Sequence, residues 1–190
     1  MRGTTLIELM IALAVAGIVI SAAVISGHAL LAQYRATAAI NHIIGAVQYA
    51  RHAAVSLRGT VTVCPGFDGA CARRNEWHRG IVVFKDENAN GRVDFNDNIL
   101  IQLPALGRGE RIYWRSFGNR SYLQINARGL TNWQNGHLLY CPPDGDEHYA
   151  REIIINVQAR VRSARDADGD GIIEDARGRP VVCPDAPRTS

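Results

Sequence analysis

Residues 3–25 read GTTLIELMIALAVAGIVISAAVI, and no charged side chain occurs from Met10 to Ile25. The apolar character continues to Ala32. A run of about 20 apolar residues is long enough to cross a bilayer as a single helix. Arg2 precedes the run, so the positive-inside tendency predicts a cytoplasmic amino end and an exported remainder.

Glu8 is the one carboxylate at the edge of this apolar run. An ionisable group is costly there, which indicates a function. The stretch GTTLIEL at residues 3–9 resembles the prepilin signal of type IV pilins and type II secretion pseudopilins. The resemblance implies that prepilin peptidase cuts after Gly3, that Thr4 becomes the methylated first residue, and that the apolar segment is retained. A plain signal anchor with a stray glutamate is the alternative interpretation.

Pairing between subunits gives Glu8 a physical role in this family. A newly exposed α-amino group on Thr4 is positive at neutral pH. The Glu8 carboxylate of a neighbouring subunit would offset the burial cost of both charges and set the axial register of a filament. We therefore expect three partners: other pilin or pseudopilin subunits, the peptidase, and the bacterial inner membrane, which the chain spans once with its head in the periplasm.

The rest of the chain changes from helical to strand periodicity. Apolar residues recur at helical spacing from Leu30 to Leu57 without a proline, and Gly59 is the expected stop. Short strand-like runs separated by Gly, Asn and Asp follow, which is typical of an antiparallel sheet. The expected strands are 60–64, 80–85, 98–103, 111–114, 121–125, 136–140 and 151–157.

The predicted fold class is α+β, a pilin-like lollipop in which one long N-terminal helix packs on an antiparallel β-sheet head. Four segments are expected. They are a leader peptide at 1–3, a membrane and assembly half of the helix at 4–32, an amphipathic half at 33–58, and a periplasmic β-rich head with a disulfide-tied tail at 59–190.

The chain has an even number of cysteines, and the predicted export would take them into an oxidising compartment. We therefore expect disulfides among Cys64, Cys71, Cys141 and Cys183. Sequence allows three pairings, and proximity favours Cys64–Cys71 with Cys141–Cys183. A zinc site is the alternative, although no C-x-x-C spacing supports it.

The head narrows the resemblance to the FimT/GspH group of minor pilins and pseudopilins. The similar features are the cysteines, Trp77, Gly80, the run Val83–Asp86 and a late Ile-Ile-Ile strand. The resemblance implies a non-enzymatic FimT-like minor pilin of a type IV pilus, with an H-type minor pseudopilin of a type II secretion system as the alternative. Motifs for nucleotide binding, zinc proteases and serine hydrolases are absent from the sequence, so an enzyme is not expected.

DNA is a further partner that the FimT resemblance implies. DNA-uptake members carry a GRxR motif in the tail, and the matching residues 159–162 here read ARVR. Arginine side chains on a loop can contact phosphates without reading base sequence. Seven arginines and seven acidic residues in 151–190 cancel in charge, which weighs against this hypothesis. The predicted DNA-binding residues are Arg160, Arg162, Arg165, Arg177 and Arg179.

Two acidic loops have the spacing of calcium ligands. The loop 86–97 matches an EF-hand frame, and the alternative is a hairpin turn. The loop 166–175 alternates carboxylates with glycines, and the alternative is a solvated acidic turn. A calcium-dependent surface adhesin would rest on these loops alone. No cofactor is required, and calcium is the ion the loops suggest. Its predicted ligands are Asp86, Asn88, Asn90, Asp94, Asp97, Asp166, Asp168, Asp170 and Glu174.

Overall fold

The computed structural model describes residues 5–184, except for the side chains of residues 21–26 and 75. The chain forms two compact units, Met1–Arg35 and Ala36–Ser190. Helix α1 (Leu6–Ser56) contributes to both. Within the described residues, no helical stretch has the length and apolarity needed to cross a membrane. The predicted anchor at 4–32 includes residues outside this description and stays a prediction.

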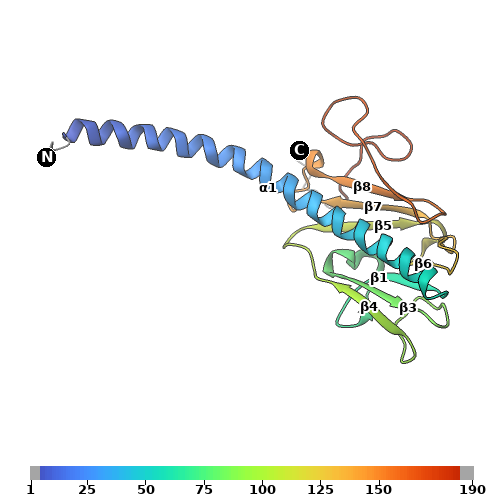
Figure 1. The fold of residues 1–190 in the computed structure, drawn as a ribbon. Coiled ribbons are helices and arrows are strands. Elements are labelled where there is room, and N and C mark those ends of the chain that lie inside the picture. Colours follow the sequence, from blue (N-terminus) through green and yellow to red (C-terminus); the bar gives the residue numbers. More distant parts are fainter. Residues whose placement is uncertain (1–4, 185–190) are drawn as a thin grey trace. The chain divides into compact units, whose positions relative to one another are not determined.

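The second unit begins with the part of α1 that forms one wall of the core. Buried positions recur every three or four residues, which places them on a single helical face. Many of them are alanines, so the helix backbone can lie close to the strands. Figure 1 shows this part of α1 lying across the strands of the second unit. The buried alanines are Ala36, Ala39, Ala46, Ala50, Ala53 and Ala54.

The C-terminus of α1 is closed by a backbone motif that differs from the expected one. Gly59 was the predicted stop, but the left-handed residue is Arg58, with φ of 50°. The Gly59 N–H donates to the Ala54 carbonyl at 3.2 Å. This contact is the closing hydrogen bond of a Schellman-type end, which satisfies one of the last helical carbonyls.

The first antiparallel sheet is organised around β1, which pairs with β2, β3 and β6. β3 pairs in turn with β4, and the register shifts between Val83 and Phe84. The strands are β1 (Val61–Phe67), β2 (Ala70–Cys71), β3 (Ile81–Lys85), β4 (Asn98–Leu103) and β6 (Leu123–Ile125). The turn η1 (Arg74–Arg79) leads into β3.

The second antiparallel sheet has the order β5-β7-β8-β9. Its strands are β5 (Arg111–Ser116), β7 (Gly136–Cys141), β8 (Arg151–Ile155) and β9 (Val161–Ser163). The turn η2 (Phe117–Asn119) follows β5. The turn η3 (Glu147–Tyr149) precedes β8. β2 and β9 were not predicted. Both are very short and pair at sheet edges, so their sequences carry little periodicity.

The two sheets and α1 share one core, and this arrangement confirms the predicted α+β class. Side chains from α1, β1, β3 and from β5 to β8 form that cluster. A smaller cluster on the outer face of the second sheet joins Leu139 and Ala150 to Ile173 and Val181 of the C-terminal segment. Residues 164–184, called the tail below, thus cover this face.

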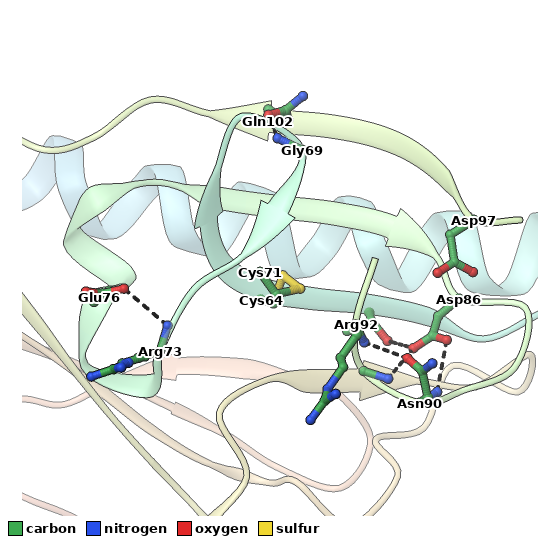
Figure 2. The surroundings of a disulfide bond; sticks show 12 residues. Cys64, Gly69, Cys71, Arg73, Glu76, Asp86, Asn90, Arg92, Asp97 and Gln102 are labelled. Atoms are coloured by element: carbon green, nitrogen blue, oxygen red, sulfur yellow. Dashed lines mark hydrogen bonds between the residues drawn. A yellow bond between two sulfur atoms is a disulfide. The ribbon is translucent and has the colours of Figure 1, made fainter. Parts of the chain in front are cut away.

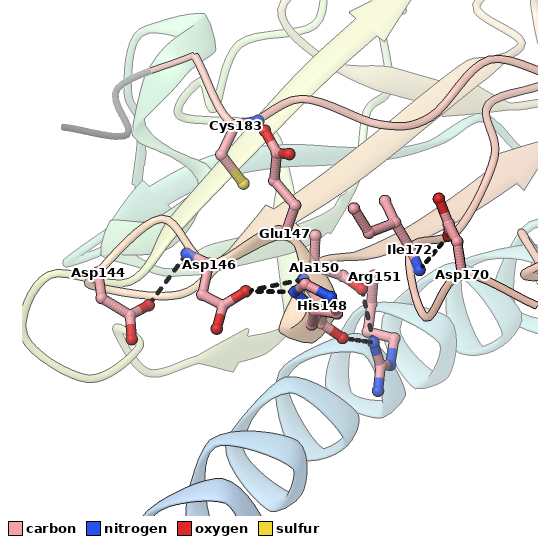
Figure 3. A network of polar contacts seen from close by, with 9 residues as sticks. All are labelled: Asp144, Asp146, Glu147, His148, Ala150, Arg151, Asp170, Ile172 and Cys183. Atoms are coloured by element: carbon pink, nitrogen blue, oxygen red, sulfur yellow. Dashed lines mark hydrogen bonds and ion pairs between the residues drawn. The ribbon is translucent and has the colours of Figure 1, made fainter. Parts of the chain in front are cut away.

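Two disulfide bonds cross-link the second unit. Cys64–Cys71 closes the short β1–β2 hairpin, as Figure 2 shows. Cys141–Cys183 ties the tail to β7, and the Cys183 N–H donates to Glu147 Oε1 at 3.3 Å, the two residues facing each other in Figure 3. The pairing favoured by sequence proximity is therefore the one present.

Candidate functional site

The acidic loop of the tail brings four carboxylates together. One oxygen from each lies within 4.8 Å of those of the others. Backbone donors shape the loop: the N–H groups of Gly169 and Gly171 donate to Asp166 at 2.7 and 2.9 Å. Clustered exposed oxygen atoms can bind a hard cation. The four residues are Asp166, Asp168, Asp170 and Glu174.

Glycine is required where this loop reverses direction. Gly169 and Gly171 have φ of 84° and 91°, in the left-handed region that L side chains rarely adopt. Asp170 accepts from the Ile172 N–H at 2.8 Å, a contact drawn in Figure 3. The alternation of carboxylates and glycines therefore has a local backbone cause.

The loop 86–97 is held by its own hydrogen bonds. The Asp86 side chain is only 1% exposed and accepts at one oxygen from Thr62 Oγ1 at 2.7 Å and Gln124 Nε2 at 3.0 Å. The N–H groups of Asn90 and Gly91 donate to the same carboxylate at 3.1 and 2.9 Å, and Figure 2 shows Asp86 beside Asn90. Asp86 is thus buried and bonded by side chains of β1 and β6, unlike the largely exposed carboxylates of the tail loop, so we interpret this loop as a turn.

The other predicted ligands of that loop are also engaged with one another. Asp94 Oδ2 accepts from the side-chain amides of Asn88 and Asn90 at 2.9 and 2.6 Å. These hydrogen bonds lower the pKa of Asp94 below its usual value. Asp97 accepts from the N–H groups of Glu87 and Asp94 at 2.9 and 2.8 Å. We therefore do not propose calcium here.

The five arginines predicted to bind DNA line three hollows, two of which adjoin because Asp175 lines both. Arg160 lines a groove with Arg51 and His52 of α1. Arg162 and Arg165 line a hollow that also holds Asp168 and Glu174, whose charges oppose theirs. Arg177 and Arg179 line a third cavity. Ala159, which stands where the motif has glycine, adopts φ of 52°.

That third cavity was not predicted from sequence. It measures about 550 Å³ and lies between the outer face of the second sheet and the tail. Tyr113, His137, Leu139, Glu152 and Val181 line its interior. Arg115, Arg177 and Arg179 line it with exposed side chains. We call this space the tail cavity.

Glu152 is the unusual residue of the tail cavity. It is 4% exposed, and its Oε1 atom has no hydrogen-bond partner. Burial, with a smaller effect from Asp175, raises the pKa of Glu152 to about 7. Burial also lowers the pKa of His137, whose Nδ1 lies 4.0 Å from Glu152 Oε1. The only sequence signal was an acid within the apolar run of β8, which alone indicates a solvent-facing position.

The charge of Asp175 is compensated by an arginine of its own loop. Its carboxylate pairs with the Arg179 guanidinium at 2.8 Å and accepts from the N–H groups of Arg177 and Arg179. The side-chain hydrogen bond from Arg179 lowers the pKa of Asp175 to about 2. Asp175 therefore stays ionised and paired.

The predicted assembly residues lie at the start of the chain. Gly3 and Thr4 are outside the described residues. Glu8 lies in the first turn of α1, where a carboxylate is favourable, and its side chain is exposed. Its role in assembly stays a prediction.

Comparison with models of protein families shows which family this chain belongs to. The model described as type II transport protein GspH matches residues 39–159, more than half of the chain. The chain belongs to the GspH family. The model of the prokaryotic N-terminal methylation motif also matches, over residues 1–24. The protein is thus a non-enzymatic minor pilin or pseudopilin with a prepilin-type start, and the tail lies beyond the GspH match.

Solved structures of two kinds share the fold of this GspH-family chain. The type IV minor pilin FimU of Pseudomonas aeruginosa has 17% identity and a TM-score of 0.54, covering 77% of this chain and 93% of FimU. The minor pseudopilin EpsH of the Vibrio cholerae type 2 secretion system has 10% identity and a TM-score of 0.50, covering 68% of this chain and 95% of EpsH. None of the curated protein sequences compared with the chain matches it.

Proposed function

We propose that this protein is the H-type minor pseudopilin of a type II protein secretion system. The observation that carries the proposal is the GspH match, which includes the C-terminal part of α1 from residue 39 and the strands β1 to β8. The FimT-like type IV minor pilin that we first favoured is the weaker hypothesis. The likeness to FimU and to EpsH supports a shared fold and does not separate the two systems.

DNA uptake forms no part of the proposal. Of the arginines expected to bind DNA, Arg162 and Arg165 share a hollow with Asp168 and Glu174, and Arg179 is paired with Asp175. Phosphate binding by a loop needs several cations facing one strand. Arg162, Arg165 and Arg179 instead lie beside carboxylates that compete with phosphate for them.

The proposed assembly step uses the first residues of the chain. Prepilin peptidase cuts after Gly3 and Thr4 becomes the methylated amino end, as the N-terminal methylation match supports. The residues 4–32 anchor the subunit in the inner membrane and then enter the pseudopilus. There, the Glu8 carboxylate of one subunit pairs with the Thr4 amine of its neighbour, because an unpaired charge in an apolar filament core is strongly disfavoured.

Gene deletion in the source bacterium tests the choice of system. We expect the deletion to stop secretion of type II substrates into the medium and to leave pilus-dependent surface motility intact. The wild-type gene should restore secretion, and a Glu8→Ala gene should not, although the subunit accumulates in the membrane. A deletion that abolishes motility and spares secretion would replace the pseudopilin with the type IV pilin hypothesis.

We also propose that the acidic loop binds calcium. Its support is a set of four carboxylates around one point, with oxygen chemistry that suits this hard cation. Calorimetric titration of the full chain with calcium should give a saturable heat that Asp168→Asn weakens. Asp144→Asn, an exposed change outside the cluster, is the matched control and should leave the titration unchanged. Absence of any heat would refute the site.

A further inference from the structure

The tail cavity lies between two parts of the chain, and the GspH family model matches only one of them. Residues of β7 and β8 line one side of the cavity and lie inside the family match. The tail lines the other side and lies beyond residue 159, where the match ends. We propose that the tail cavity is a binding site for a carboxylate group, supplied by an acidic side chain or by the free end of a polypeptide. This inference is independent of the secretion system to which the subunit belongs.

The floor of the cavity holds a polar atom that lacks a partner. Glu152 Oε1 is buried and unbonded, and the 4.0 Å gap to His137 Nδ1 is too long for a hydrogen bond. A buried polar atom without a partner costs the folded protein free energy. A ligand oxygen placed between these two side chains would satisfy both.

The outer part of the cavity carries positive charge that the protein does not neutralise. Within the described residues, the side chains of Arg115 and Arg177 form no hydrogen bond or ion pair. Arg179, by contrast, is paired with Asp175. Two free guanidinium groups beside a concave surface suit a planar anion, which arginine can bind through two parallel hydrogen bonds.

The charges that face Glu152 come from every surrounding element. They are Arg115 on β5, Arg162 on β9 and Asp175 in the tail, and the neighbouring His137 on β7 is also affected by Arg177 of the tail. Asp175 is paired with Arg179, so among the described residues the unpaired positive charges that line the tail cavity are those of Arg115 and Arg177. An anionic group is therefore attracted, and a lysine or arginine side chain of a partner would be repelled by the same guanidinium groups.

Glu152 can donate a hydrogen bond to a bound carboxylate when it is protonated. Burial raises its pKa to about 7, so a large fraction of the molecules carry the proton near neutral pH. A protonated carboxyl donates a strong hydrogen bond to a carboxylate, and such O–H···O⁻ contacts are among the shortest in proteins. Above the pKa, two carboxylates would repel each other. Binding should therefore weaken as the pH rises from 6 to 8.

Peptide titration of the full chain in detergent micelles tests the proposal. The signal is the His137 ring resonance, because this ring lines the cavity. The probes are a blocked pentapeptide with one central glutamate among alanines, its glutamine and lysine analogues, and an acetylated pentaalanine with a free carboxyl end. The glutamate peptide and the free-ended peptide separate the two sources of a carboxylate.

We expect at least one carboxylate probe to shift the His137 signal in a saturable way, and the glutamine and lysine peptides to leave it unchanged. Affinity should fall about tenfold from pH 6 to pH 8, as the protonated fraction of a group with a pKa near 7 falls by that factor. Arg115→Gln should weaken binding about tenfold, the loss expected from one charge-assisted contact. Arg111→Gln, an exposed change on the same strand outside the tail cavity, should have no effect.

Three results would overturn the proposal. The first is that neither carboxylate probe shifts His137 at pH 6, and the second is that the lysine peptide binds instead. The third is that Arg115→Gln and Arg111→Gln bind the probe with equal affinity. Because the Arg115 side chain is exposed and forms no hydrogen bond or ion pair with the described residues, its substitution leaves the fold intact and the comparison valid.

Discussion

Glu152 makes the stability of the head depend on pH. The folded protein holds the pKa of this carboxyl at about 7, above its ordinary value of 4.5. Below the ordinary value both the folded and the unfolded chain carry the proton, and no stability is lost. As the pH rises towards 7, the unfolded chain releases the proton first, so the folded state loses stability across that window.

Replacing the carboxyl by an amide should remove this dependence. We expect Glu152→Gln to match the wild type near pH 4 and to be more stable at pH 8 by up to about 3 kcal/mol. Urea unfolding at several pH values measures the difference. Glu87→Gln, at an exposed site, is the control and should follow the wild-type curve. An unchanged pH slope in Glu152→Gln would show that another group causes it.

The two acidic loops differ in how well sequence spacing predicts the contacts of their carboxylates. The oxygen ligands at 166–174 lie within a single short segment, so spacing alone brought Asp166 and Glu174 together. Asp86 looked similar in sequence, but its partners Thr62 and Gln124 lie on β1 and β6. Long-range contacts of this kind leave no local pattern.

At the scale of elements, close packing of α1 on the sheets depends on small side chains. Ala50 and Ala54 are fully buried in a core cluster that includes strands of both sheets. A larger side chain there would force the helix away from the strands or into a strained rotamer. The same helix exposes Tyr49, so neighbouring positions differ sharply in their tolerance.

Ala50→Leu should therefore destabilise the second unit by about 1–3 kcal/mol through overpacking. Tyr49→Leu, one position away on the exposed face, should change stability by less than about 0.5 kcal/mol. The free energy of unfolding of the full chain, followed by tryptophan fluorescence because Trp77 and Trp114 are buried in the core, gives both values. Equal effects of the two changes would contradict the packing argument.

At the scale of the whole molecule, the chain combines an exposed apolar helix with a disulfide-bonded head. The first unit exposes large apolar side chains, including those of Ile7, Leu13 and Ile18. Such a surface needs lipid or other subunits to cover it. Two disulfides in the second unit agree with an oxidising compartment.

Processing of the full chain follows from the prepilin-type start. We expect protein purified from membranes of its host to begin at Thr4, with a methylated amine, because the methylation motif covers residues 1–24. Intact mass spectrometry measures both changes. A host without its prepilin peptidase provides the control and should retain Met1. Mature protein that still begins at Met1 in the normal host would refute the proposed assembly step.

The sequence alone determined the features that have a local physical cause. Helical spacing through residue 56, the strand alternation and the left-handed glycines of the acidic loop all arise from neighbouring residues. The predicted disulfides join cysteines whose pairing proximity already favoured. The resemblance of residues 3–9 to a prepilin signal likewise needs only a short segment.

The tertiary structure alone decided where distant segments meet. It folded the tail over the second sheet, buried Glu152 beneath it, and placed Arg162 and Arg165 beside Asp168 and Glu174. Burial and charge at a residue depend on what packs against it from elsewhere in the chain. An exposed and a covered strand face can carry the same local sequence, so the tail cavity became visible only after folding.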